Sequence, residues 1–346
     1  MITVSNLVQK RPKQATWRPI VAKYQKPNLG RSLWQIANTH IPYILLWIIM
    51  IQTIKISYWL TLPFIFLAAG FLVRNFIIFH DCGHQSFFAS RRANNIVGFI
   101  TGILSYTPYV AWRHDHAVHH ASSGDLDRRG NGDIWMLTVE EYLNASPKDQ
   151  FIYRFYRDPF IQFLIMPVFA FLIFNRLPLS KMGSRERRSV FQTNVALAIG
   201  IVLMGFLIGF KTFFVLQLSI AVIAASVGMW LFYVQHQYEG VYWEKHETWD
   251  FARAAVEGSS FYKLPKILQW FTGNIGYHHI HHLSPRIPNY LLEKCHEENP
   301  LFQQTVVLTL RSSLKSIFLT LWDEEQKKLI SFRHLKQRRL EVSQAS

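Results

Sequence analysis

The chain has 346 residues, of which half are apolar and 17% are charged, and its formal net charge is +15. Its two cysteines, Cys82 and Cys295, exclude an iron–sulfur cluster held by four cysteines of this chain and argue against a disulfide framework. No nucleic-acid-binding motif accompanies the positive charge. We therefore attribute the charge to membrane topology and anionic lipid, and expect no nucleic-acid partner.

The predicted elements begin with a basic arm over residues 1–36, which lacks the short apolar core of a cleavable signal peptide. Two shorter apolar runs, over 96–110 and 160–174, predict interfacial or re-entrant helices. Four longer runs approach the roughly twenty residues needed to cross a bilayer: 37–54, 57–79, 191–210 and 213–235. We predict one all-α domain, an integral membrane helical bundle over 37–235 with cytosolic inserts, followed by a cytosolic cap and tail over 236–346.

Lysine and arginine predict the orientation of the bundle. Because basic loops stay in the cytoplasm, the arm and the loop after Phe174 belong there. His80 follows the second crossing and His236 ends the fourth, so both return to the cytoplasmic side. The two shorter segments must then cross an even number of times or not at all. The basic residues behind this prediction are Lys10, Arg11, Lys13, Arg18, Lys23, Lys26, Arg31, Arg176, Lys181, Arg185, Arg187 and Arg188.

Three histidine groups share one spacing pattern. Residues three and four apart lie on one face of a helix, so each group can present its imidazoles in one direction. Imidazole is the commonest protein metal ligand near neutral pH. Eight imidazoles are too many for one ion, which predicts two metal ions. The groups are His80 and His84 in HDCGH, His116, His119 and His120 in HDHAVHH, and His278, His281 and His282 in HHIHH.

The position of these groups narrows the chemistry. The chain has no HExxH motif, which argues against a zinc peptidase. Sites built from imidazole suit zinc, copper, iron or nickel, so the ligands alone do not name the ion. The groups begin where apolar helices leave the bilayer, so a lipid chain can be the substrate, and chemistry on an unactivated carbon points to oxygen and a redox metal. A metal transporter, the distant alternative, would place its ligands within the spans.

Four stretches of the chain resemble the membrane fatty acid desaturase family, and most closely its Bacillus-type acyl-lipid desaturases. The resemblance covers most of the chain and weakens at the N-terminal arm and the C-terminal end. The three histidine boxes in this order and spacing carry it together. The stretches are FIIFHDCGHQSFF at 76–88, HDHAVHHASSGDLDRRGNGDIWMLTVEEY at 114–142, LFYVQHQYEG at 231–240 and EGSSFYKLPKILQWFTGNIGYHHIHHLSPRIPNY at 257–290.

The resemblance implies a di-iron centre held by the eight box histidines, with His236 in YVQHQ as a further ligand. It implies that the chain uses O2 to introduce a cis double bond, at Δ5, into phospholipid acyl chains on the cytoplasmic side of a bacterial inner membrane. The chain lacks a GxGxxG fingerprint, a cytochrome domain and cluster cysteines, so we expect electrons from a ferredoxin or flavodoxin docked on the basic cytosolic face. A lipid or hydrocarbon hydroxylase of the same three-box superfamily is the nearer alternative.

Other residues near the boxes are candidates for supporting roles. A metal-bound imidazole usually donates its second N–H to a carboxylate or carbonyl. Neighbouring helical positions point about 100° apart, which disfavours Asp81 and Asp115 for this role. Asn274, four residues before His278, is either an outer contact of the metal site or a helix cap. The candidate carboxylates are Asp81, Asp115, Asp125, Asp127, Asp133, Glu239 and Glu257.

The remaining histidines and four further side chains have two interpretations each. His114 and His279 exceed the box pattern, and we expect them either to support the metal ligands through hydrogen bonds or to be surface polar residues. We expect Arg74, inside a span, to reach lipid phosphate rather than an acidic residue beneath the metal site. We expect Tyr106, Tyr109 and Trp112 to mark the membrane interface rather than line an acyl channel. We assign exposed or structural roles to His40, His246, His296 and His334.

Overall fold

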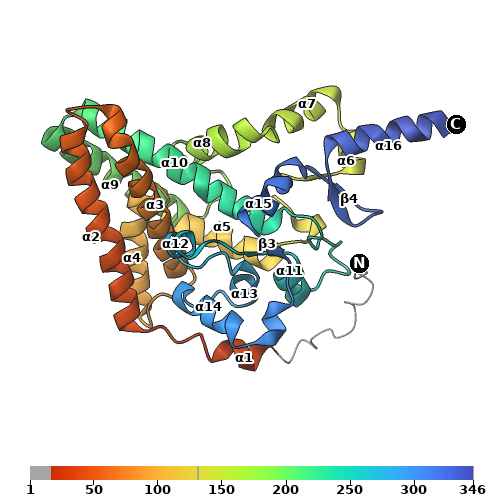
Figure 1. The fold of residues 1–346 in the computed structure, drawn as a ribbon, viewed down its shortest axis with the longest axis horizontal. Coiled ribbons are helices and arrows are strands. Elements are labelled where there is room, and N and C mark those ends of the chain that lie inside the picture. Colours follow the sequence, from red (N-terminus) through yellow and green to blue (C-terminus); the bar gives the residue numbers. More distant parts are fainter. Residues whose placement is uncertain (1–16, 131, 346) are drawn as a thin grey trace.

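The computed structural model describes residues 17–130 and 132–345 and places a bundle of long helices beside a smaller cap (Figure 1). Lys10, Arg11 and Lys13 of the predicted basic arm lie outside the described residues. Within those residues, four helices are long and apolar enough to cross a membrane, which confirms the predicted spans. They are α2 (Leu29–Thr53), α3 (Tyr58–Gly83), α9 (Ser184–Ile208) and α10 (Phe210–His236).

Local sequence explains where these helices begin and turn. The Ser57 side chain accepts a hydrogen bond from the Trp59 N–H and so caps α3. Gly209 alone separates α9 from α10, and its φ of +85° is a conformation that glycine adopts without steric cost. Large apolar side chains on the outer faces are exposed, Phe206 by 81%, as expected for helices that face lipid.

Shorter helical segments connect the second span to the third. The apolar run predicted over 96–110 is not one helix, because α4 ends at Leu104 and the next helix begins at Tyr109 with Pro108 as its N-cap residue. Between them, Tyr106 adopts a φ of +55°. The segments are α4 (Arg91–Leu104), α5 (Tyr109–Ser122), η2 (Leu126–Arg128), α6 (Val139–Asn144), α7 (Pro147–Tyr156), the π-helical η3 (Ile161–Ile165), α8 (Met166–Leu172) and η4 (Phe174–Arg176).

The stretch from α7 to η4 is bent by 59° where the chain passes from Pro147–Tyr156 to Ile161–Arg176. If this stretch crossed the membrane once, α9 and α10 would run through the membrane in the reverse direction. His236 would then lie on the opposite side of the membrane from α5. His119 of α5 contacts His236, with 3.2 Å between their Nε2 atoms. The stretch therefore does not cross once, in agreement with the predicted parity.

The cap consists of short helices and strands that lie below and to the right of the long helices in Figure 1. Its helical elements are α1 (Arg18–Ala22), α11 (Phe251–Glu257), α12 (Lys266–Phe271), α13 (His278–Leu283), α14 (Asn289–Glu297), η5 (Pro300–Gln303), α15 (Leu310–Ser313), η6 (Leu314–Phe318) and α16 (Phe332–Ala345). Its strands, together with β1 from the inserts, are β1 (Leu137–Thr138), β2 (Phe261–Tyr262), β3 (Val307–Leu308), β4 (Leu321–Asp323) and β5 (Lys328–Ile330).

Two small sheets connect the cap to distant parts of the chain. β1 pairs with β4 in parallel, with Leu137 opposite Leu321, and β4 pairs with β5 in antiparallel fashion. β2 and β3 form a second parallel pair. Tyr142 and Tyr153 of the inserts pack on Leu321 in one buried cluster. The C-terminal segment therefore fixes the position of the inserts between α5 and α9.

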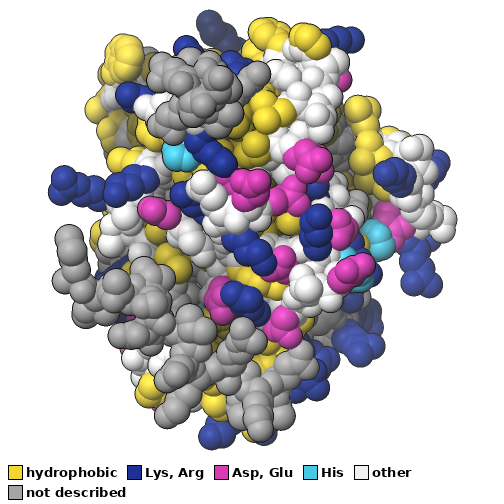
Figure 2. Space-filling view, turned by 90° about the vertical axis from the view of Figure 1, so that its right-hand side faces the viewer, with side chains coloured by type: hydrophobic (Ala, Val, Ile, Leu, Met, Phe, Trp, Pro, Cys, Tyr) yellow, Lys and Arg dark blue, Asp and Glu magenta, His cyan; other side chains and the backbone are white. Residues whose placement is uncertain are grey.

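Figure 2 shows the face of the molecule at the right-hand side of Figure 1. Basic and acidic side chains are interspersed over this face, which indicates a surface in contact with water. Two ion pairs, Lys327 with Glu244 at 2.6 Å and Lys245 with Glu324 at 3.5 Å, join the loop after α10 to the turn between β4 and β5. The cap is thus polar outside, whereas the long helices expose apolar side chains.

Candidate metal centre

The nine predicted ligands come from the C-terminal ends of α3 and α10 and from the helices α5 and α13. α3 ends at Gly83 with His84 as its C-cap residue, and α10 ends at His236. α5 and α13 carry histidines at spacings of three and four, so each helix turns them to one face, as the sequence predicted. The structure brings together His80, His84, His116, His119, His120, His236, His278, His281 and His282.

Five of these imidazoles form one cluster. One ligand nitrogen from each residue lies within 4.8 Å of those of the others. The Nε2 atom of His116 lies 3.1 Å from that of His80 and 3.2 Å from that of His120. The Nε2 atoms of His120 and His281 are 3.0 Å apart. The members of this cluster are His80, His84, His116, His120 and His281.

A second cluster lies directly beside the first. Ligand nitrogens of His119, His236 and His282 lie within 4.8 Å of one another. His278 joins them through its Nε2 atom, which is 3.0 Å from that of His236. The ring of His282 stacks on that of His120 with 4.1 Å between centroids, so the two clusters share a boundary. Two adjacent groups of imidazoles fit the two metal positions expected from the sequence.

Hydrogen bonds from outside the clusters orient three of the rings. Nδ1 of His119 lies 2.5 Å from a carboxylate oxygen of Asp133, and Nδ1 of His236 lies 3.2 Å from the Gly258 carbonyl. Nδ1 of His80 lies 3.3 Å from Asp81, so the expectation that adjacent residues do not face each other is wrong here. The helix ends within three residues of His80, and Asp81 is held by two hydrogen bonds from Asn289, at 2.7 and 2.8 Å. These contacts leave Nε2 of each ring to face its cluster.

The other candidate carboxylates have different contacts. Asp115 and Glu239 are exposed. Asp125 and Asp127 bind the side chain and backbone of His246, and Glu257 pairs with Arg253.

Burial favours the neutral form of six of the clustered imidazoles. It lowers the pKa of the histidines outside the spans well below the ordinary value, and neighbouring imidazoles lower it further. This holds for His84, His116, His120, His278, His281 and His282. A neutral imidazole retains the lone pair that a metal ion requires.

Unpaired nitrogens support the same conclusion. Nε2 of His84 and Nε2 of His282 are buried, and among the described residues neither has a hydrogen-bond partner. Neutral rings with unpaired buried nitrogens are compatible with a metal site.

The remaining histidines lie outside the clusters. Nε2 of His279 contacts the Phe302 carbonyl at 2.9 Å, and His114 is exposed. His246 binds Asp125 at 2.7 Å, and His40 binds Asn75 at 3.0 Å. The expected surface or structural roles of His114, His246 and His40 are confirmed, whereas the expectation for His279 is wrong, because its ring is buried and contacts a backbone carbonyl rather than a cluster imidazole.

Two polar residues differ from expectation. Asn274 is not helical, since its φ is +58° and α13 begins only at His278; its side chain binds Gln269 and the Asn289 carbonyl. Arg74 is 6% exposed and does not reach the surface. Its guanidinium donates to the Trp270 carbonyl and lies 3.9 Å from the Trp270 ring centroid, so both predicted interpretations of Arg74 are wrong.

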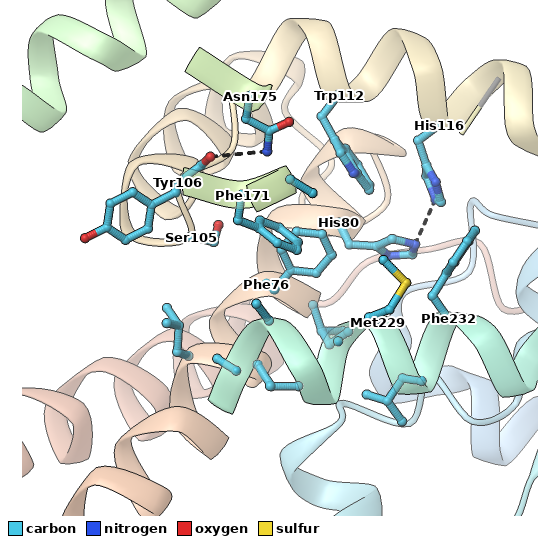
Figure 3. Close-up of a pocket in the computed structure, with 18 of the residues that line it drawn as sticks. Phe76, His80, Ser105, Tyr106, Trp112, His116, Phe171, Asn175, Met229 and Phe232 are labelled. Atoms are coloured by element: carbon cyan, nitrogen blue, oxygen red, sulfur yellow. Dashed lines mark hydrogen bonds between the residues drawn. The ribbon is translucent and has the colours of Figure 1, made fainter. Parts of the chain in front are cut away.

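An apolar cavity of about 380 Å³ borders the histidine clusters (Figure 3), and we call it the acyl pocket after the substrate that the sequence resemblance predicts. His80, His116 and His278 form part of its wall, and Trp112 stacks on His116 with 4.3 Å between centroids. Figure 3 shows His80 and His116 at one end and Tyr106 and Asn175 at the other. Along α10, small residues recur at helical spacing and leave room for the cavity. They are Ala221, Ala224, Ala225 and Gly228.

The three aromatic residues before the second histidine group separate into two roles. Trp112 and Tyr106 line the acyl pocket, so the expectation of an interfacial position is wrong for them. Tyr109 is buried and donates to the Cys82 carbonyl at 2.7 Å, which packs α5 against the end of α3. Their sequence positions alone did not separate these roles, because α4 and α5 turn sharply between Ser105 and Pro108.

The structure combines a helical membrane bundle with clustered imidazoles and a long apolar cavity beside them. These features are typical of membrane proteins that have a histidine-rich metal site for lipid chemistry. A sequence model of the fatty acid desaturase family matches residues 57–311. The chain belongs to the fatty acid desaturase family, and is therefore an oxidoreductase.

Curated relatives agree with this assignment. A fatty acid desaturase of Bacillus subtilis (strain 168) is 50% identical over 318 residues, which cover 91% of this chain and 90% of the relative. An sn-1 acyl-lipid omega-3 desaturase (ferredoxin) of Nostoc sp. (strain 36) is 29% identical over 80% of this chain and 77% of its own length. An sn-1 oleoyl-lipid 12-desaturase of Synechocystis sp. is 28% identical over 69% of this chain and 68% of its own.

Proposed function

We propose that this protein uses O2 to introduce a cis double bond, at Δ5, into an acyl chain of a membrane phospholipid. The observation that carries the proposal is the wall shared by the acyl pocket and the histidine clusters. A chain in the pocket passes directly beside His80, His116 and His278. Gln235 and Ala221, both in the wall, are separated by about 21 Å of helix at 1.5 Å per residue. This length exceeds the roughly 15 Å of one leaflet of the hydrocarbon core.

The two histidine clusters would hold two iron ions. His80, His84, His116, His120 and His281 would bind one ion, and His119, His236, His278 and His282 the other. Among the metals that imidazole suits, iron combines a fit to nitrogen ligands with oxygen chemistry on unactivated carbon. When bound, the iron pair supplies the oxidation that removes two hydrogens from adjacent methylenes.

The protein residues have separate tasks in this reaction. The imidazoles stay neutral and coordinate, and Asp133, Asp81 and the Gly258 carbonyl orient three of them. The aromatic and small residues of the acyl pocket exclude water and hold the chain in one register. Such positioning selects which pair of methylenes reacts.

The electrons would come from a ferredoxin or flavodoxin. The Nostoc relative is named for its use of ferredoxin, and the net charge of +15 favours an acidic partner. By the positive-inside rule the cap and the histidine clusters would face the cytoplasm of a bacterial inner membrane.

Expression in a bacterial host that makes no unsaturated fatty acids tests this proposal. We expect phospholipids with a Δ5 double bond, located by mass spectrometry of derivatised lipids. His120→Ala should abolish the product, whereas His334→Ala, which changes a histidine outside the clusters, should not. Saturated lipids alone, from accumulated iron-loaded protein with a competent reductase, would refute desaturation. Hydroxylated chains would indicate a hydroxylase, and another position would refute Δ5.

A further inference from the structure

A second cavity, of about 390 Å³, lies beyond the inner end of the acyl pocket, and we call it the distal cavity. It lies between α9 and α10, and apolar side chains such as Leu197 and Ile201 make up most of its wall. Tyr106, Leu172 and Ala221 belong to the walls of both cavities. The two spaces are similar in volume and meet at these three residues.

Tyr106 has the largest side chain of the three and is held in an uncommon conformation. Its φ of +55° lies in the left-handed region, which a bulky residue seldom occupies. The side chains of Arg176 and Asn175 both donate to the Tyr106 carbonyl, and Arg176 is fixed in turn by Asn194. Strained residues held by several contacts often serve a function.

The direction of the Tyr106 side chain agrees with a position at the boundary between the two cavities. Figure 3 shows the carbonyl of Tyr106 toward Asn175 and its ring turned away from His80 and His116. The left-handed backbone and the anchored carbonyl together direct the ring to the far end of the acyl pocket. The ring lies at the junction of the two cavities, since Tyr106 belongs to the walls of both.

The orientation of a bound acyl chain follows from which end of the acyl pocket has exposed residues. Asp115 and Gly132 line the acyl pocket near His116 and are exposed, so the wall at the histidine end lies close to the surface. The polar ester end of a lipid remains near water, and its methyl end then lies at Tyr106. The methyl end is the part of the chain whose reach depends on the depth of the pocket.

We propose that Tyr106 is a specificity-determining residue that closes the acyl pocket and limits the length of the acyl chain the enzyme accepts. The inference rests on the proposed function, because it takes the occupant of the pocket to be an acyl chain. Removal of the ring joins the two cavities and doubles the available space. A longer methyl end can then enter the distal cavity without displacing the carbons beside the histidines.

Tyr106→Gly is the direct test, since glycine adopts the left-handed backbone at no steric cost. The variant and the wild type are expressed in the host described above, supplied with palmitic, stearic or arachidic acid. We expect the ratio of arachidoyl to palmitoyl desaturation to rise by roughly tenfold or more, which is the discrimination that one methylene gives in an apolar pocket. Tyr106→Phe keeps the ring and should keep the wild-type ratio.

Ala198 provides a matched control because it lines the distal cavity and not the acyl pocket. Ala198→Phe alone should leave the ratio unchanged, and combined with Tyr106→Gly it should cancel the gain. If Tyr106→Gly does not accumulate, Ala221→Leu tests the same boundary, because it narrows the junction and should lower the ratio of arachidoyl to palmitoyl desaturation.

The outcomes separate this inference from the proposed function. An active wild type with an unchanged ratio in Tyr106→Gly, or in Ala221→Leu where that variant is needed, overturns the role of Tyr106. A gain that persists when Ala198→Phe is added also overturns it. A wild type that forms no double bond refutes the proposed function itself.

Discussion

Gly228 offers a test of whether the acyl pocket holds the substrate. It lies among the small residues of α10 that line the pocket, and apart from its chain neighbours and the backbone of its own helix no described atom lies within 4 Å of the position a Cβ would take. We therefore expect Gly228→Leu to place four carbons in the cavity. Leucine also favours a helix over glycine by about 0.8 kcal/mol, so the fold should not be weakened.

The expected loss follows from the displaced substrate. Four carbons occupy the space of about four methylenes, each worth about 0.8 kcal/mol when buried, so binding of the acyl chain should weaken by about 3 kcal/mol, or roughly 150-fold. The assay is kcat/KM for desaturation of palmitoyl phospholipid in proteoliposomes, with the metal content of each preparation measured in parallel.

Gly200→Leu is the matched control. Gly200 lies on α9, has no described atom within 4 Å of a Cβ position, and lines neither cavity. Its substitution by leucine should leave kcat/KM unchanged. Wild-type kcat/KM in Gly228→Leu, or an equal loss in both variants, would show that this cavity does not hold the reacting chain.

Three further predictions concern the metal site, acid stability and the electron donor. Asp133→Asn weakens the contact that orients His119 and should reduce iron content or activity about 10- to 100-fold. Asp127→Asn, which changes a carboxylate that contacts His246, should not. Equal metal loading and turnover in both variants would contradict the role of Asp133 in orienting His119. Burial, then nearby His296, lowers the pKa of His279 to about 3, so His279 takes up a proton on unfolding. Its contribution to stability is complete above about pH 6.5 and falls by about 1.4 kcal/mol per unit as pH drops from 6.5 toward 3. His279→Gln should flatten the decline of the thermal midpoint with acid, and an unchanged slope would be evidence against the buried neutral ring. The KM for ferredoxin should rise as ionic strength increases from about 0.01 to 0.15 M, because the Debye length shortens from about 30 to 8 Å; a constant KM would argue against electrostatic docking.

The sequence predicted the main frame of the site because its signals are local. The apolar runs identified four spans, and the histidine spacing identified helix faces, which depend on residues three and four apart. The assembly of His80 with His281, which lie about 200 positions apart, was inferred from their matching spacing, and a count of crossings placed the histidine groups on one side of the membrane. That count needs the direction of each helix, and no further detail of packing.

The details that escaped prediction depend on chain ends and tertiary contacts. Asp81 contacts its neighbour His80 because α3 ends there and because Asn289 holds the carboxylate through two hydrogen bonds. Arg74 binds the Trp270 carbonyl, which belongs to a segment nearly 200 residues away. Tyr106 joins the pocket wall through a reversal between α4 and α5 that Pro108 marks without specifying its direction.

The parallel pairing of β1 with β4 has a consequence for biosynthesis. Asp133 lies four residues before β1, and β1 is held by a strand that begins at Leu321. Translation reaches that strand nearly 190 residues after Asp133, whereas α5, which carries His119, is made shortly before Asp133. We therefore expect the Asp133 carboxylate to be fixed beside His119 only after β4 has been made and paired with β1.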